Sequence, residues 1–113
     1  MRIISGKLKG STLYLTKTKN TRPLKDLARE SIFNLLTHSN KISFSIEKSI
    51  ILDLFSGTGS FGLECLSRKA GKVFFIEKEK EAITILKKNI KKLNLENKAK
   101  IFNNDVFKII KKK

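Results

Sequence analysis

The sequence has 113 residues, of which 40% are hydrophobic and 31% charged, and a formal net charge of +15. This length allows one domain, and the composition is typical of a globular protein rather than a disordered chain. Apolar runs reach about six residues, far below the ~20 of a membrane helix, and no signal peptide is evident. The single Cys65 excludes an internal disulfide and a cysteine pair for a metal, and is most simply a small buried hydrophobe. We therefore expect a cytoplasmic protein with no metal and no membrane contact.

The basic excess favours a polyanionic partner. Lys and Arg number 25 against 10 Asp and Glu, and each phosphate that a cation neutralises releases counterions. A lysine-rich composition also arises from the compositional bias of a genome. Charge alone thus favours nucleic-acid binding and leaves this second explanation open.

Residues 1–25 are predicted to form a basic hairpin arm. Two β-prone segments, Arg2-Ile3-Ile4 and Thr12-Leu13-Tyr14-Leu15, flank a stretch that contains two glycines. Seven cations precede the first acidic residue, and they are Arg2, Lys7, Lys9, Lys17, Lys19, Arg22 and Lys25. This pattern favours a flexible extension that grips phosphates, with a solvated surface hairpin as the alternative.

Residues 26–49 are predicted to contain a helix and a polar linker. Pro23 suits the start of a helix that runs from about residue 24 to 37, and the linker covers residues 38–49. Apolar residues at helical spacing define the expected buried stripe, which consists of Ala28, Ile32, Leu35 and Leu36. Arg29 and Glu30 fall off this stripe, where they could face a ligand or form surface pairs.

Residues 50–113 alternate strands and helices. Strands are expected at 50–55, 72–77 and 100–105, with helices from about 63 to 70, 78 to 93 and from 106 onward. Ile50 to Phe55 is nearly all apolar, as in a central strand buried on both faces. The helix at 78–93 carries Ala82, Ile83, Leu86, Ile90 and Leu93 on one face. This alternation predicts an α/β fold with a parallel sheet.

A glycine-rich turn follows the first of these strands. Gly57, Gly59 and Gly62 have G-x-G-x-x-G spacing between a strand and a helix. Such glycines allow a tight turn, a close approach of backbone to ligand, and close packing of helix on strand. Alone the pattern is often only structural. Its position between a strand and a helix favours a nucleoside-containing ligand bound above the turn.

Acidic residues mark the ends of all three expected strands. They are Asp53, Glu77 and Asp105, at the edge of the sheet where such folds bind ligands. Glu77 lies 20 residues after Gly57, the offset at which a carboxylate accepts hydrogen bonds from ribose hydroxyls. Taken singly, Glu77 could instead be a charge at a helix N-terminus and Asp105 an N-cap. Asp53 favours a cationic ligand over the pyrophosphate of NAD, so a nicotinamide-dependent oxidoreductase is the weaker alternative.

The motifs resemble those of a known family. Asp53-Leu-Phe-Ser-Gly-Thr-Gly-Ser-Phe-Gly-Leu-Glu64 is similar to the first motif of class I S-adenosylmethionine-dependent methyltransferases. The wider chain resembles the RsmD family of bacterial 16S rRNA guanine-N2 methyltransferases. The resemblance rests on residues 2–10, 22–23, 29–36, 66–68, 75–77 and 88–90. It implies a Rossmann-like class I methyltransferase sheet, preceded by the basic β-hairpin and a helix.

The resemblance also implies site residues. S-adenosyl-L-methionine would be bound at its methionine end by Asp53 and the Gly57–Gly59 loop, at the ribose by Glu77 and at the adenine amine by Asp105; Phe55 belongs to the same cofactor-binding set. RNA, as 16S rRNA or the small ribosomal subunit, would be held by Arg2, Lys7, Lys9, Arg22 and Arg29. The sequence departs from the family at Leu24, at Leu27, and at Lys69, where glycine is usual.

The catalytic motif of the family is not present in these residues. That motif is Asn/Asp-Pro-Pro-Phe/Tyr after the fourth strand, and the chain has one proline, Pro23. We therefore assign no catalytic residue and expect residues 1–113 to be a single, truncated methyltransferase domain with its cofactor-binding part at 50–113. The full-length protein is expected to be a monomer. Without a fourth strand, Ile50–Phe55 would expose an apolar edge. The alternative is a non-catalytic fragment that binds RNA or cofactor.

Overall fold

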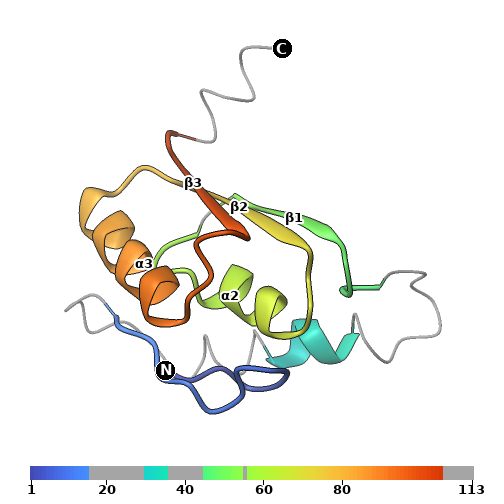
Figure 1. The fold of residues 1–113 in the computed structure, drawn as a ribbon. Helices are drawn as coiled ribbons and strands as arrows, with labels where there is room; N and C mark the ends of the chain where they lie inside the picture. Colours follow the sequence, from blue (N-terminus) through green and yellow to red (C-terminus); the bar gives the residue numbers. More distant parts are fainter. Residues whose placement is uncertain (16–29, 36–44, 55, 106–113) are drawn as a thin grey trace.

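The computed structural model describes residues 1–15, 30–35, 45–54 and 56–105. Three parallel strands, β1 (Ile50–Asp53), β2 (Lys72–Glu77) and β3 (Ala99–Asn103), form a sheet in the order β1-β2-β3. Helix α2 (Ser60–Ser67) joins β1 to β2, and α3 (Lys80–Lys92) joins β2 to β3 (Figure 1). The predicted α/β alternation is confirmed over these residues. The helix expected from residue 106 lies outside them.

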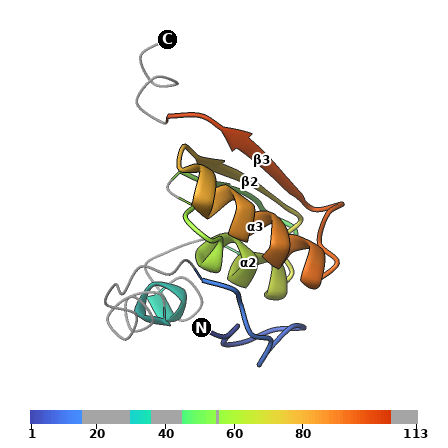
Figure 2. The same ribbon diagram turned by 90° about the vertical axis from the view of Figure 1, so that its left-hand side faces the viewer.

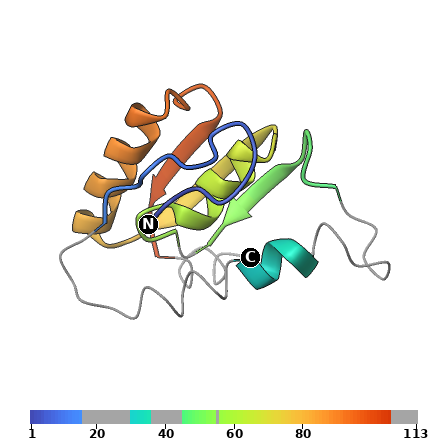
Figure 3. The same cartoon turned by 90° about the horizontal axis from the view of Figure 1, so that it is seen from below.

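The elements form layers. Helices α2 and α3 cover one face of the sheet, and the N-terminal arm (residues 1–15) lies beyond the helices, on the side away from the strands (Figure 2). Seen from below, the arm crosses the surface that α2 and α3 form together (Figure 3). The arm is therefore packed on the helices that follow the glycine turn and β2.

The core lies between the sheet and the two helices. Val73 and Phe75 of β2 are fully buried, as are Leu63 of α2 and Leu86 of α3. The apolar face predicted for the helix of residues 78–93 is confirmed, because all five of its residues are buried: Ala82, Ile83, Leu86, Ile90 and Leu93. Amphipathic periodicity was a sufficient signal for this helix.

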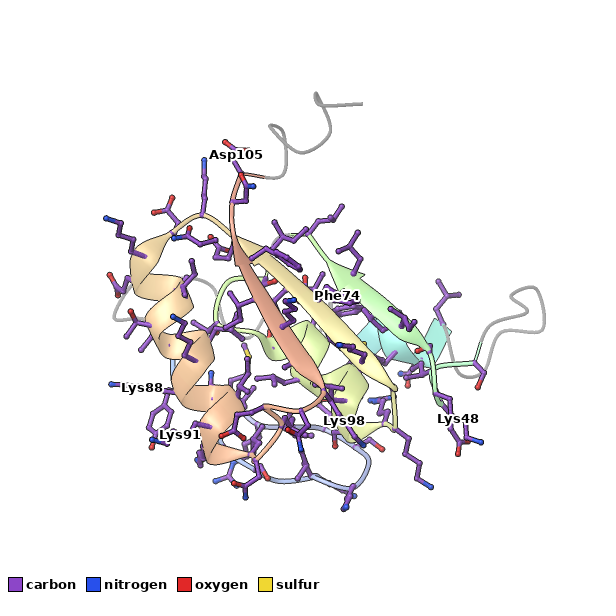
Figure 4. The ribbon with its side chains drawn as sticks, turned by 45° about the horizontal axis from the view of Figure 1, so that its top comes forward. Lys48, Phe74, Lys88, Lys91, Lys98 and Asp105 are labelled. Atoms are coloured by element: carbon purple, nitrogen blue, oxygen red, sulfur yellow. The ribbon has the colours of Figure 1, made fainter. Side chains whose placement is uncertain are left out.

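The prediction that the first strand is buried on both faces is wrong. Ile50 is 73% exposed and Leu52 57%, because no described element covers the sheet face opposite α2 and α3. Leu52 pairs in register with Phe74, whose ring centroid lies 6.0 Å from that of Phe102 (Figure 4). Among described residues β1 pairs with β2 alone. The unpaired edge predicted for this strand is therefore present among the described residues.

The stripe predicted for the helix near residue 30 is also incorrect. Residues 30–35 are helical, but Ile32 is 44% and Leu35 55% exposed. The buried residue is Phe33, which stacks on Phe61 with a centroid distance of 5.1 Å and lies 4.3 Å below the Arg68 guanidinium. Within residues 30–35, packing is therefore through this one aromatic side chain. Ala28 and Leu36 lie outside the described residues.

Helix α2 ends at Ser67, before the predicted Ala70-Gly71, in a Schellman motif. The amide of Lys69 donates to the Leu66 carbonyl (3.1 Å) and that of Ala70 to the Cys65 carbonyl (2.9 Å). Lys69 has φ +75°, which is the left-handed conformation that this motif requires and that glycine adopts without strain.

Lys69→Gly is therefore expected to raise the free energy of unfolding by about 0.5–1 kcal/mol. The left-handed conformation costs an L-residue about 1–2 kcal/mol, and the larger unfolded-state entropy of glycine cancels part of the gain. Urea denaturation of the purified chain measures the change. Lys88→Gly is the matched control, because Lys88 is exposed inside α3, where glycine is expected to cost about 1 kcal/mol. A loss of stability in both Lys69→Gly and Lys88→Gly would contradict the assignment of Lys69 to the left-handed position of a Schellman motif.

Candidate functional site

The turn after β1 is held against the carboxyl end of β2. The buried Ser56 donates from its hydroxyl to the Asp53 carbonyl (2.9 Å) and from its amide to the Ile76 carbonyl (3.2 Å). The Gly59 amide donates to the Ser56 carbonyl at 2.8 Å and closes the turn. The glycine loop thus has a fixed position over the strand ends.

The structure favours glycine at the three positions of the loop for different reasons. Gly62 packs on β2, since a Cβ there would lie 2.3 Å from the Phe75 ring. Gly59 has φ +95°, and a Cβ would lie 2.3 Å from Leu86 Cδ1 on α3. Gly57 has φ +54° with open space where its Cβ would be. The predicted close packing of helix on strand is confirmed at Gly62, and the open space beside the half-buried Gly57 lets a ligand approach its backbone.

Glu77, the last residue of β2, bonds to both sides of the candidate site. Its Oε1 accepts from the Gly57 amide (2.7 Å), and its Oε2 accepts from the amides of Lys78 (3.1 Å) and Glu79 (3.0 Å) just before α3. The carboxylate therefore holds the glycine loop and the start of α3 together. Its contact with the helix start is confirmed, and its role as a ribose acceptor remains a prediction.

The other two strand-end acids lie at the same edge of the sheet. Asp53 is the last residue of β1 and is 8% exposed. Asp105 follows β3, and its amide donates to the Asn104 side chain at 2.8 Å (Figure 4). The Asn104 amide in turn donates to the Glu77 carbonyl at 3.1 Å, which brings the chain after β3 beside the end of β2. Whether Asp105 caps a helix concerns residues outside those described, as does the position of Phe55.

Cys65 behaves as the predicted small buried hydrophobe. It is 1% exposed, and burial raises the pKa of its thiol to about 12, with the Asp53 and Glu64 charges acting in the same direction. The neutral thiol is therefore the form present at neutral pH, and it packs in the hydrophobic core rather than acting as a nucleophile.

A buried carboxylate of α2 binds the first part of the arm. Glu64 is 0% exposed, and it accepts from the amides of Ile4 (2.8 Å) and Ser5 (3.0 Å) and from Arg68 Nε (2.9 Å). One helical turn later, Ser67 Oγ accepts from the Leu8 amide and donates to the Ser5 carbonyl. Sequence reasoning missed these contacts, although a charged residue between Leu63 and Cys65 in a buried helix was a usable signal.

Residues 1–15, which form the N-terminal arm, are docked on the helices. This corrects the expectation of a flexible extension for this part of the chain. The predicted antiparallel pairing occurs as a single bridge between Arg2 and Thr12, and Ile3 and Leu13 beside it are buried at 2% and 6% exposure. Arg2, Lys7 and Lys9 have exposed side chains, with Arg2 also bonded to the Gly10 carbonyl at 3.3 Å. Their RNA-binding role remains a prediction. Arg22 and Arg29 lie outside the described residues.

The described part of the chain has neither a candidate metal site nor a candidate membrane span. That part contains no group of three or more His, Cys, Asp or Glu side chains placed to hold a metal ion. It also contains no helix of the length and apolarity that crossing a membrane requires.

Comparisons with known proteins point to one family. The model of the family described as Conserved hypothetical protein 95 matches residues 1–113. The Ribosomal RNA small subunit methyltransferase D of Buchnera aphidicola subsp. Baizongia pistaciae is 42% identical over 97 residues, which are 86% of this chain and 47% of that protein. The chain thus spans about half the length of the curated relatives it matches.

Solved structures share the fold. The putative methyltransferase yhhF from Escherichia coli superposes with a TM-score of 0.78 at 30% identity, over 97% of this chain and 55% of that one. The structure of PRMT6-SAH gives a TM-score of 0.63 at 26% identity, over 80% of this chain and 25% of that one. The class I methyltransferase fold expected from the motifs is confirmed.

Proposed function

We infer the function of this chain from one premise: it belongs to the Conserved hypothetical protein 95 family, the RsmD family, whose relatives are named as rRNA methyltransferases. We propose that it binds S-adenosyl-L-methionine over the glycine loop and provides the cofactor-binding part of an rRNA methyltransferase. The proposed reaction methylates the exocyclic N2 amine of a guanine in small-subunit rRNA. The observation that carries the cofactor proposal is the Glu77 carboxylate, bonded at 2.7 Å to the Gly57 amide above open space.

The donor set fits this cofactor. Carboxylates at strand ends accept hydrogen bonds from ribose hydroxyls, which we propose for Glu77, and from an adenine amine, which we propose for Asp105. The anionic Asp53 favours the positive charges of the methionine end, whereas it would repel a pyrophosphate. The Gly57 backbone is open to the ligand. NAD is therefore the weaker fit.

Bound S-adenosylmethionine supplies a methyl group on a cationic sulfur. Glu77, Asp105 and the Gly57–Gly59 loop would hold the cofactor, which would supply this methyl group to the amine nitrogen, with the sulfur leaving as a neutral thioether and the amine proton passing to solvent. The residues of this chain bind and orient the cofactor. Acceptors that would orient the amine are not assigned, because a Pro-Pro pair cannot occur in a chain with one proline, Pro23. We expect the 113-residue chain alone to show little or no turnover.

Calorimetric titration of the purified chain tests the cofactor proposal. We expect S-adenosylmethionine to bind with a dissociation constant of about 1–100 µM and NAD to give no heat at the same concentrations. Binding of NAD but not S-adenosylmethionine would favour an oxidoreductase. Binding of 16S rRNA without either nucleoside ligand would favour the alternative of a non-catalytic RNA-binding fragment.

A further inference from the structure

Asn89 of α3 bonds two segments that are far apart in the chain. Its side chain is completely buried, and all of its donors and its acceptor are used. Oδ1 accepts from the Tyr14 amide (2.6 Å), and Nδ2 donates both to the Tyr14 carbonyl (3.0 Å) and to the Thr58 carbonyl (2.9 Å). Thr58 lies between Gly57 and Gly59. One amide group thus joins the arm to the glycine loop.

Asn89 is the middle member of a row on α3. Leu86, one turn earlier, supplies the surface on which Gly59 lies, with 2.3 Å between its Cδ1 and the position of a Gly59 Cβ. Lys92, one turn later, donates from Nζ to the Thr12 carbonyl (2.8 Å) and hydroxyl (2.6 Å). Residues at this spacing share one face of a helix. Along α3, Leu86 therefore contacts the glycine loop, Asn89 contacts both the loop and the arm, and Lys92 contacts the arm.

We propose that Asn89 is a positioning residue that couples cofactor binding at the glycine loop to RNA binding at the arm. This inference rests on the proposed function and adds the link between its two ligands. A cofactor bound against the loop restrains the Thr58 carbonyl and, through the hydrogen bond that this carbonyl accepts, the Asn89 amide. The amide then holds both backbone groups of Tyr14, and Arg2, Lys7 and Lys9 lie on the same docked arm.

The expected sign of the coupling is positive. Whichever ligand binds first stabilises the shared contact against local opening, so the second ligand loses less conformational entropy on binding. Linkage is reciprocal: the factor by which cofactor tightens RNA binding equals the factor by which RNA tightens cofactor binding. A shared buried amide with three hydrogen bonds is a physical connection of the kind such coupling needs.

Filter binding of purified bacterial 16S rRNA, with and without saturating S-adenosylmethionine, measures the coupling. For the unmodified chain we expect about tenfold tighter RNA binding with cofactor present. Asn89→Ala should bring this ratio to within about twofold of one. Lys88→Ala, which changes the exposed neighbour, should keep the ratio while weakening RNA binding slightly. If the role of Asn89 were purely structural, Asn89→Ala would weaken the binding of both ligands. The ratio of RNA affinity with and without cofactor would then stay unchanged, and this result would overturn the proposal.

Hydrogen exchange on the unmodified chain gives a test that needs no variant. Saturating S-adenosylmethionine should slow exchange of the Tyr14 amide, the group that donates to Asn89 Oδ1, by about fivefold or more. Unchanged exchange of that amide in the cofactor-bound chain would refute the coupling even if Asn89→Ala does not fold. Absence of any cofactor binding would refute the proposed function and the coupling together. Binding of both ligands without linkage would refute the coupling alone.

Discussion

Glu77→Gln is expected to weaken S-adenosylmethionine binding by about 10- to 100-fold. A hydrogen bond to a charged acceptor contributes about 1.5–3 kcal/mol, and about 1.4 kcal/mol is a factor of ten in affinity. Glutamine keeps one oxygen for the Gly57 amide, but its NH₂ group would face the amides of Lys78 and Glu79, which are also donors. The substitution therefore removes an acceptor and disturbs the loop over which we propose that the ligand binds.

Calorimetry of the variant measures this effect, and Glu79→Gln is the matched control. Glu79 is exposed two residues away, so its replacement makes the same change in charge without touching the glycine loop. Urea denaturation of both variants separates lost affinity from lost folding. An equal loss of affinity in the two variants would show that net charge, rather than the Glu77 contacts, holds the cofactor.

Glu64→Ala is expected to lower the free energy of unfolding by about 3–5 kcal/mol, because it removes one partner of a buried ion pair. The carboxylate is fully buried, and its loss leaves the amides of Ile4 and Ser5 and the Arg68 guanidinium without their acceptor. The arm loses these two hydrogen bonds to α2 at the same time and keeps those that it makes with Ser67. Total stabilities of small domains are about 5–15 kcal/mol, so this change is large.

Equilibrium urea unfolding, with limited proteolysis of the arm, measures the Glu64 effect. Glu96→Ala at an exposed position is the control, and we expect it to change stability by less than about 0.5 kcal/mol. Glu64→Gln should be intermediate, since it keeps one oxygen but turns an NH₂ group toward the donors. A loss below about 1 kcal/mol for Glu64→Ala would mean that the ion pair contributes little beyond a hydrogen bond.

The elements that the sequence predicted well are those with strong local periodicity. β2 occupies the predicted residues 72–77, and α3 starts two residues later than predicted and ends one earlier. The glycine loop was recognisable because its spacing reflects local backbone needs, which the positive φ angles of Gly57 and Gly59 show. Local signals of this kind can be recognised in a single sequence.

The features that sequence reasoning missed depend on partners far along the chain. Glu64 and Asn89 bond to residues 60 and 75 positions away, and no spacing rule connects such pairs. Ile32 was assigned to a buried stripe by helical period, but Phe33 is buried because Phe61 and Arg68 surround it. The apolar run Ile50–Phe55 predicts a buried strand. Such a run does not say whether other elements cover both faces of the sheet at that strand.

The uncovered sheet face has a consequence for the handling of this chain in solution. Lys72 and Lys100 lie 5.4 and 5.6 Å from the ring centroids of Phe74 and Phe102, so each of these two rings has a cation beside it. Like charges repel a second copy that approaches through the same face, over about 8–10 Å at moderate ionic strength but only about 3 Å in 1 M salt. Strongly excluded salts also strengthen apolar association. Solubility should therefore fall as salt rises.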